Sequence, residues 1–160
     1  MPKPKSAQCV QIFVHYQAPW LMPCGLRQLQ SQLKIMLKQA AQNPFGQKIK
    51  DLDLFLVNDA EIAWHNLMSM RCPGPTNILS FPGGQDLPGS LILSLDTLKR
   101  ECLLYGQKLE VHFWRLLAHG LAHLAELDHG PEHQALEALC HKPFLSASEN
   151  LSQAQETLSL

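Results

Sequence analysis

VHFWRLLAHGLAHLA, residues 111–125, is almost wholly apolar, and it is interrupted mainly by Arg115 and three histidines. Its pattern is helical, and apolar residues on nearly every side predict a helix buried through the middle of the domain. A helix that spans a membrane needs about 18 or more apolar residues, which neither this stretch nor any other provides. We therefore expect a core helix in a protein that is not embedded in a membrane.

Patterns on both sides of this helix predict four strands and four further helices. Apolar, β-branched and aromatic residues predict strands at 8–16, 50–57, 77–81 and 90–95. Helical spacing predicts helices over 26–40, from Asp59 through Leu67, after Asp96 and over 132–140, with the two aspartates as N-caps. The elements form no regular βαβ series and include no glycine-rich phosphate loop. The predicted class is α+β, with a small four-stranded mixed sheet packed with about five helices.

Length and composition predict one domain. The chain has 160 residues, of which 46% are hydrophobic, and this is enough for one core. We place the domain at 1–145 and expect the polar, serine-rich segment 146–160 to be a flexible tail. The start of the chain lacks the apolar core of a signal peptide. Five scattered cysteines, with no Cys-x-x-Cys pair, indicate neither a disulfide framework nor a cysteine zinc cluster, so a reducing cytoplasm is expected.

Charge is distributed unevenly along the chain. Residues 1–50 contain seven Lys or Arg and no Asp or Glu, whereas residues 51–160 contain the other six basic residues and all fourteen acidic ones. Arg27, Lys34 and Lys38 are spaced by seven and four, so they line one face of the predicted helix. Such a surface suits a polyanion, because neutralising phosphates releases counterions. A solvated face with a chance imbalance is the alternative.

The segment HGLAHLAELDH contains three histidines, His119, His123 and His129. Two histidines four residues apart lie on one helix face, and the third follows where the helix can end and fold back. Without a shared ligand, their buried nitrogens would each cost ~1–3 kcal/mol. Three neutral imidazoles with an open fourth position are typical of a catalytic zinc site, although they also accept Ni, Co or Cu. We expect one Zn²⁺ per chain, in a cleft at the central helix.

The first two histidines also begin the motif of the zincin peptidases. In that motif the general-base Glu follows the first His, where this chain has Gly120. Glu126 or Asp128 would have to act as the base instead. Either carboxylate can also accept a hydrogen bond from an imidazole N–H, and we favour Asp128 for that role. A zinc-dependent amidase or peptidase is therefore an alternative function.

At this motif the chain resembles the YbeY family of bacterial rRNA-maturation endoribonucleases, whose signature is H-G-x-L-H-L-x-G-Y-D-H. The matching positions are His119, Gly120, His123, Leu124, Asp128 and His129, whereas Ala122, Glu126 and Leu127 replace Leu, Gly and Tyr. A second block, TNILSFP at 76–82, is similar to the family's T-[DN]-V-L-S-F-P strand, with Asn66 ten residues before it. The resemblance spans most of residues 8–143.

Two further positions, outside the histidine motif, depart from the family's pattern. The family commonly has an Arg four residues after the Asn, where this chain has Met70 followed by Arg71. We expect Arg71 to take the catalytic role, in which a guanidinium pairs with a phosphate through two hydrogen bonds. Ser90 replaces an acidic residue of the fourth strand.

The resemblance implies a single-strand-specific metallo-endoribonuclease of the cytoplasm. Its implied roles are rRNA maturation and ribosome quality control, with small-subunit rRNA or the ribosome as partner. In the expected mechanism, Zn²⁺ lowers the pKa of a water molecule to ~7, and the resulting hydroxide attacks phosphorus. The other alternative is a non-catalytic ribosome-binding module with a structural zinc, which chelation would unfold.

Overall fold

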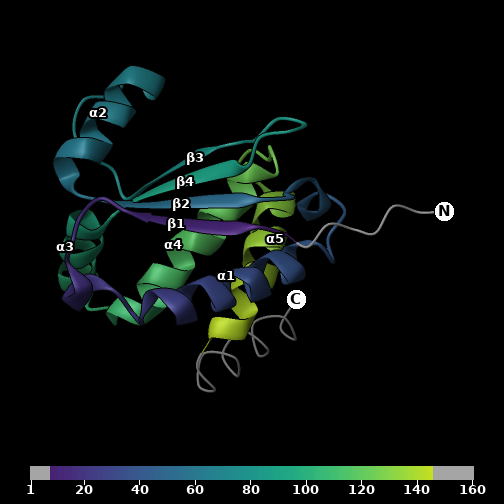
Figure 1. Ribbon diagram of the computed structural model, residues 1–160, viewed down its shortest axis with the longest axis horizontal. Helices are drawn as coiled ribbons and strands as arrows, with labels where there is room; N and C mark the ends of the chain where they lie inside the picture. The colour runs from purple at the N-terminus through teal and green to yellow at the C-terminus, as the bar shows by residue number, and fades with distance from the viewer. Residues whose placement is uncertain (1–7, 146–160) are drawn as a thin grey trace.

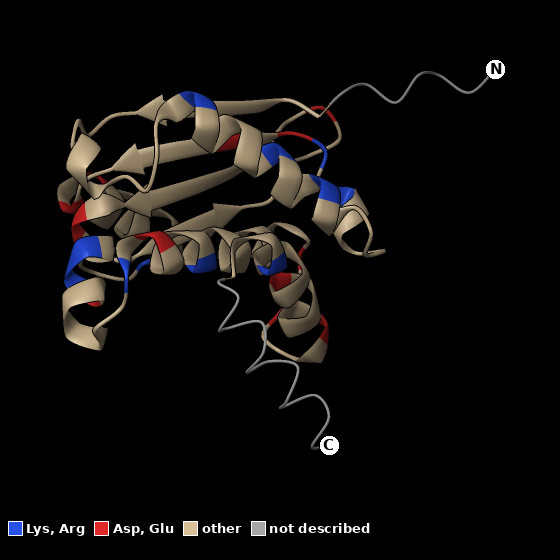
Figure 2. Ribbon diagram, turned by 90° about the horizontal axis from the view of Figure 1, so that it is seen from below, with Lys and Arg blue, Asp and Glu red and all other residues tan. Residues whose placement is uncertain are grey.

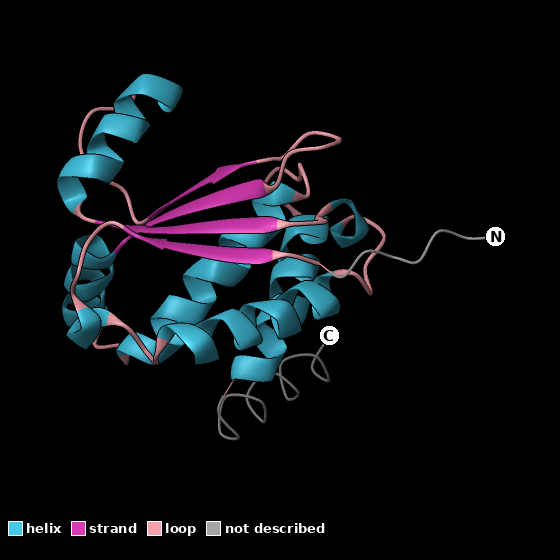
Figure 3. Ribbon diagram, viewed as in Figure 1, coloured by secondary structure: helices cyan, strands magenta, loops and turns pink. Residues whose placement is uncertain are grey.

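The computed structural model describes residues 8–145 (Figure 1). Within this range, four strands form one sheet, and five α-helices pack mostly against one of its faces (Figure 3). The predicted α+β class, a mixed sheet packed with about five helices, is therefore confirmed. The predicted tail, 146–160, lies outside the described residues, so the division into one domain and a tail stays a prediction.

The sheet has the strand order β1-β2-β4-β3. The bounds of its strands are β1 (Val10–Val14), β2 (Leu52–Val57), β3 (Ile78–Phe81) and β4 (Gly89–Ser94). β1, β2 and β4 run parallel, and β3 is antiparallel to β4. Leu54 and Leu91 are register partners on the two central strands, and both are fully buried. Since alternate strand residues point to opposite faces, these leucines mark the face that carries the main core.

The helices lie mostly on that face of the sheet. Figure 1 shows α1 (Leu26–Ala40), α4 (Leu109–Leu124) and α5 (Pro131–His141) together below the strands, with α3 (Leu95–Tyr105) beside α4. α2 (Asp59–Met70) lies at one end of the sheet, and its Ile62 packs on the opposite face against Val57, Leu79 and Ile92. Short 3-10 turns complete the elements at Pro19–Leu21, Gly46–Lys48 and Lys142–Phe144. Among the described residues, no helix has both the length and the apolar character needed to cross a membrane.

α4 is the central helix predicted from its apolar sequence. Phe113 and Trp114 are no more than 1% exposed, and the helix packs directly against β3 and β4. Gly120 permits this close approach, because a Cβ atom there would lie 2.8 Å from Ile78 Cδ1 and 2.9 Å from Leu91 Cδ2. The close contact at Gly120 therefore fixes the distance between α4 and the sheet at the residue that follows His119.

Two helix caps differ from the predicted ones. α2 is capped by Asn58 and α3 by Ser94, whose side-chain oxygens accept hydrogen bonds from first-turn N–H groups at 3.0 and 3.2 Å. The predictions of Asp59 and Asp96 as N-caps were wrong, since both lie inside the first turn of their helices. Asn and Ser cap helices as well as Asp does, so the residue type alone did not decide. The two aspartates instead join α2 to α3 through side-chain hydrogen bonds.

Candidate metal centre

The end of α4, the loop after it and the start of α5 bring four histidines together. His119 and His123 lie one turn apart on α4, His129 lies in the loop, and His133 lies in the first turns of α5. One ring nitrogen from each histidine lies within 4.8 Å of those of the other three. The three predicted ligands are thus neighbours in space, and a fourth imidazole joins them.

A left-handed residue allows the chain to fold back between the two helices. α4 ends at Leu124, and Glu126 has φ 61°, a conformation that costs a side-chain-bearing residue roughly 1–2 kcal/mol. This is the position where the resembled motif carries glycine, which adopts positive φ without that cost. Glu126 therefore adopts the positive φ that a glycine at this position would adopt without strain. The turn brings His129 and His133 back beside α4.

Hydrogen bonds determine which ring nitrogen of His119 and of His123 carries a proton. His119 Nδ1 lies 3.1 Å from a carboxylate oxygen of Glu137, and His123 Nδ1 lies 3.3 Å from the Leu127 carbonyl oxygen. A carbonyl or an ionised carboxylate only accepts hydrogen bonds, so both Nδ1 atoms must be donors. In the neutral tautomers that follow, both Nε2 atoms carry lone pairs.

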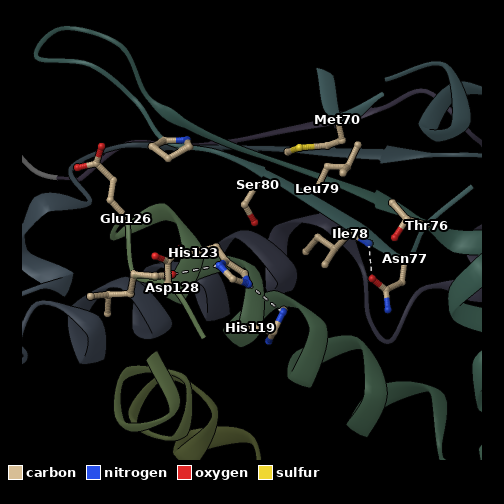
Figure 4. Close-up of a pocket in the computed structure, with 12 residues that line it drawn as sticks. Met70, Thr76, Asn77, Ile78, Leu79, Ser80, His119, His123, Glu126 and Asp128 are labelled. Carbon is tan, nitrogen blue, oxygen red and sulfur yellow. Dashed lines mark hydrogen bonds between the residues drawn. The ribbon is translucent and has the colours of Figure 1, made fainter. Parts of the chain in front are cut away.

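These two lone pairs face each other. His119 Nε2 and His123 Nε2 are 3.1 Å apart, as the dashed line in Figure 4 shows. Two acceptors at this distance repel unless a proton or a metal cation lies between them. Two nitrogen ligands on a tetrahedral ion with metal–nitrogen bonds of ~2.0–2.1 Å are roughly 3.3 Å apart, close to the observed distance. The donor set therefore fits a metal ion such as zinc.

Electrostatics favour the neutral imidazoles that a metal requires. Burial lowers the pKa of His123, and the charges of His133 and His119 lower it further. Burial also lowers the pKa of His133, as does the charge of His119. For Glu137, burial raises the pKa, but the hydrogen bond from His119 and the charges of the histidines outweigh it, so the net shift is downward. The lowered pKa favours the ionised carboxylate of Glu137 as an acceptor of the hydrogen bond from His119.

Two members of this centre were missed in the sequence. His133 repeats, after His129, the four-residue spacing of the first histidine pair, and Glu137 follows after four more residues. This repetition was the available signal. The preference for Asp128 as the imidazole acceptor was wrong, because among the described residues the acceptors are Glu137 and the Leu127 carbonyl.

A pocket of about 500 Å³ opens beside the histidines. Its lining includes the 76–82 block and the turn after α4, and Figure 4 shows Thr76, Ser80 and His123 around it. The Ser80 hydroxyl donates a 3.0 Å hydrogen bond to the Gly120 carbonyl, which ties β3 to α4 at the pocket floor. The 76–82 block therefore forms one wall of the pocket that His119 and His123 also line.

Arg71 lies at the edge of this arrangement. It is exposed and forms the left-handed C-cap of α2, with φ 55°. Its neighbour Met70 lines the pocket, whereas Arg71 is not among the lining residues. At this wall of the pocket the chain thus has the thioether of Met70, at the position where the resembled family commonly has an arginine.

The predicted basic face lies on α1. Arg27, Lys34 and Lys38 are all exposed, and the helix contains no acidic residue (Figure 2). α1 packs against α5, which carries His133. These three positive charges thus lie on a helix that packs against the same layer as the metal centre.

Comparisons with known proteins match both the sequence and the fold. The family model for endoribonuclease YbeY matches residues 23–142. An endoribonuclease YbeY of Nitratidesulfovibrio vulgaris is 39% identical over 152 residues, which cover 81% of this chain and 91% of the relative. One of Lawsonia intracellularis is 48% identical over 86 residues, covering 53% of this chain and 65% of the relative.

The solution structure of a Thermotoga maritima protein matches 84% of this chain and 91% of its own, with a TM-score of 0.53. Its sequence identity is 18%, so this match bears on the fold alone. The family match covers most of the chain and both motif blocks. The chain therefore belongs to the endoribonuclease YbeY family.

Proposed function

We propose that this protein is a zinc-dependent endoribonuclease that cleaves phosphodiester bonds in rRNA. The observation that carries the proposal is the pair of Nε2 lone pairs on His119 and His123, which face each other at 3.1 Å beside an open pocket. A hydrolytic metal site needs this combination of neutral imidazoles and room for a substrate. Membership of an endoribonuclease family supports RNA as the substrate.

His119, His123 and His129 would hold the zinc ion. When bound, the metal acts as a Lewis acid that makes water a nucleophile near neutral pH and withdraws charge from a phosphoryl oxygen. Glu137 accepts a hydrogen bond from Nδ1–H of His119, which fixes the ring's orientation and makes Nε2 the more basic metal ligand. The Leu127 carbonyl does the same for His123.

The remaining parts of the site would bind the RNA strand. The pocket is wide enough for part of a nucleotide, with Thr76 and Ser80 as polar contacts. We assign to Arg71, next to the pocket, the role of pairing with a phosphate, and to the basic face of α1 the role of holding the RNA backbone. These contacts do not read bases, so recognition would depend on single-stranded shape or on ribosomal partners, and the reaction would take place in the cytoplasm.

The direct test compares substrates and variants of the purified, zinc-reloaded protein. We expect cleavage of single-stranded RNA and no cleavage of a peptide panel. His123→Ala should lower kcat/KM for RNA by at least ~100-fold, the scale for removing a single electrostatic contact to a transition state. The control is His65→Ala, on α2 outside the four-histidine cluster. RNA cleavage that survives unchanged in a folded, metal-free His123→Ala protein would sink the proposal.

The peptidase alternative is weakened by the packing at Gly120. The base of the zincin motif cannot be accommodated at this position, since even a Cβ atom would come within 3.0 Å of side chains on β3 and β4, so a peptidase would depend on Glu126 or Asp128, which line the pocket. The alternative of a structural zinc has one observation in its favour, because structural sites have four protein ligands and four histidines converge here. Removing the zinc separates the two: a structural metal would unfold the domain, whereas a catalytic one would stop cleavage in a folded protein.

A further inference from the structure

His133 is the histidine of the cluster that the three-ligand motif does not include. Its side chain is 1% exposed, and its ring centroid lies 4.2 Å from that of His123 and 4.9 Å from that of His119. These separations are no larger than those among the three motif histidines, which run from 4.7 to 5.5 Å. His133 is therefore as close to His119 and His123 as the three motif histidines are to one another.

The two ring nitrogens of His133 have different surroundings. Nδ1 lies 3.5 Å from the same Glu137 oxygen that faces His119, whereas Nε2 is buried and has no hydrogen-bond partner among the described residues. Leaving such a nitrogen unpaired costs about 1–3 kcal/mol. Glu137 thus accepts a hydrogen bond from one imidazole, on α4, and lies 3.5 Å from a second one, on α5, with its carboxylate on the side where acceptors stand behind metal-bound histidines.

Burial without a partner does not by itself identify a ligand. His112 Nδ1, on α4, is also buried and unpaired, but it lies outside the four-histidine group. The distinguishing feature of His133 is its position, since one of its ring nitrogens lies within 4.8 Å of a ring nitrogen of each of three other histidines.

We propose that His133 is a fourth protein ligand, so that the resting metal is held by four imidazoles and has no position open to solvent. The inference rests on the metal site of the proposed function and changes its resting state. Access for a phosphate then requires one imidazole to move. His129 is the least restrained, because it is exposed and its ring has no hydrogen bond within the described part of the chain.

The test uses the full chain loaded with Co²⁺, whose visible spectrum reports ligand number, with azide as the probe. Wild type should give a tetrahedral spectrum that azide leaves unchanged. In His133→Phe, which keeps the ring volume and removes the nitrogens, azide should shift the spectrum. The dissociation constant of this variant for Co²⁺ should rise by at least ~10–100-fold. A loss of this size is typical even when only a residue that hydrogen-bonds to a metal ligand is removed.

The matched control is His112→Phe, which also removes a buried, unpaired nitrogen and should leave affinity and spectrum as in wild type. An equal loss in both variants, or a His133→Phe protein with wild-type affinity and spectrum, would overturn the assignment.

His133→Cys provides a direct readout if the Phe variant does not fold. A thiolate at a ligand position should restore tight binding and add a sulfur-to-cobalt charge-transfer band, and a folded, cobalt-loaded protein without that band contradicts the proposal. RNA cleavage by wild type is scored separately. Changed metal binding without cleavage would reject the proposed function alone, and cleavage with unchanged metal binding would reject the fourth ligand alone.

Discussion

Two polar clusters lie at opposite ends of the sheet, one between α2 and α3 and the other between α4 and α5. At the first, Asp59 accepts hydrogen bonds of 2.7 Å from Ser94 and Thr97 and one of 2.6 Å from Arg100. At the second, imidazole nitrogens face one another, and His133 Nε2 has no partner among the described residues. The first cluster is complete within the protein, whereas the second is complete only with a cation.

This difference separates a structural polar cluster from a binding site. Polar groups that saturate one another gain nothing from a ligand and fix the packing of two helices. Lone pairs that converge without a donor remain costly until something positive binds them. Polar composition alone would not distinguish the two clusters, because both contain ionisable groups next to helix ends.

Adding zinc should produce the largest difference in the free energy of unfolding between variants of the two clusters. A ligand that binds only the folded state at 1,000 times its dissociation constant adds about 4 kcal/mol to the free energy of unfolding. We expect this gain when zinc is returned to the chelated protein, measured by urea unfolding. Asp59→Asn should retain the full gain, and His123→Ala should lose it. An equal gain in His123→Ala would show that zinc binds elsewhere.

Gly120→Ala should have the next largest effect, because it forces α4 away from the wall of the metal centre. The added Cβ atom meets Ile78 and Leu91 at less than 3.0 Å, and overpacking of this kind costs about 1–3 kcal/mol of stability. Urea unfolding of the metal-free protein measures this loss. Gly84→Ala is the control, since nothing lies within 4 Å of its Cβ position. Similar losses at both positions would mean that the close helix–sheet contact is not the cause.

Asp59→Asn should lower the free energy of unfolding by about 1–2 kcal/mol near neutral pH, a value that allows for solvent around Arg100. Burial acts to raise the pKa of Asp59, but hydrogen bonds from Arg100, Thr97 and Ser94 outweigh it and hold the pKa below its usual value. The ionised form therefore stabilises the folded state above the unfolded pKa. This contribution disappears as pH falls through the folded pKa.

The stability of wild type and Asp59→Asn, measured by urea unfolding, should thus converge below about pH 4. A difference that stays constant down to pH 2 would contradict the role of the charge.

The smallest effect is expected at the turn between α4 and α5. Glu126→Gly removes the strain of a left-handed residue and should raise stability by up to about 1 kcal/mol. Glu132→Gly, in the first turn of α5, should instead lower it by a similar amount, because glycine is a poor helix former. Thermal unfolding of both metal-free variants measures the two signs. A loss of stability in Glu126→Gly would mean that the carboxylate makes a contribution larger than the strain.

The elements next to the metal centre were the most predictable from sequence. α4 follows from an apolar pattern that is local, and the juxtaposition of His119 and His123 follows from the helical repeat alone. The caps were less predictable, because Asn58 and Asp59, or Ser94 and Asp96, are chemically equivalent candidates a residue or two apart. Their choice depends on how α2 and α3 pack together.

By itself, the sequence determined the class of fold, the four strands and the helix that carries the first histidine pair. Periods of two and 3.6 residues are properties of the local backbone, and they need no distant contact. Only the tertiary structure decided that His133 and Glu137 join the centre. Their approach to His119 depends on the positive φ of Glu126 and on α5 packing against α4, and no spacing along the chain encodes a distance across a turn.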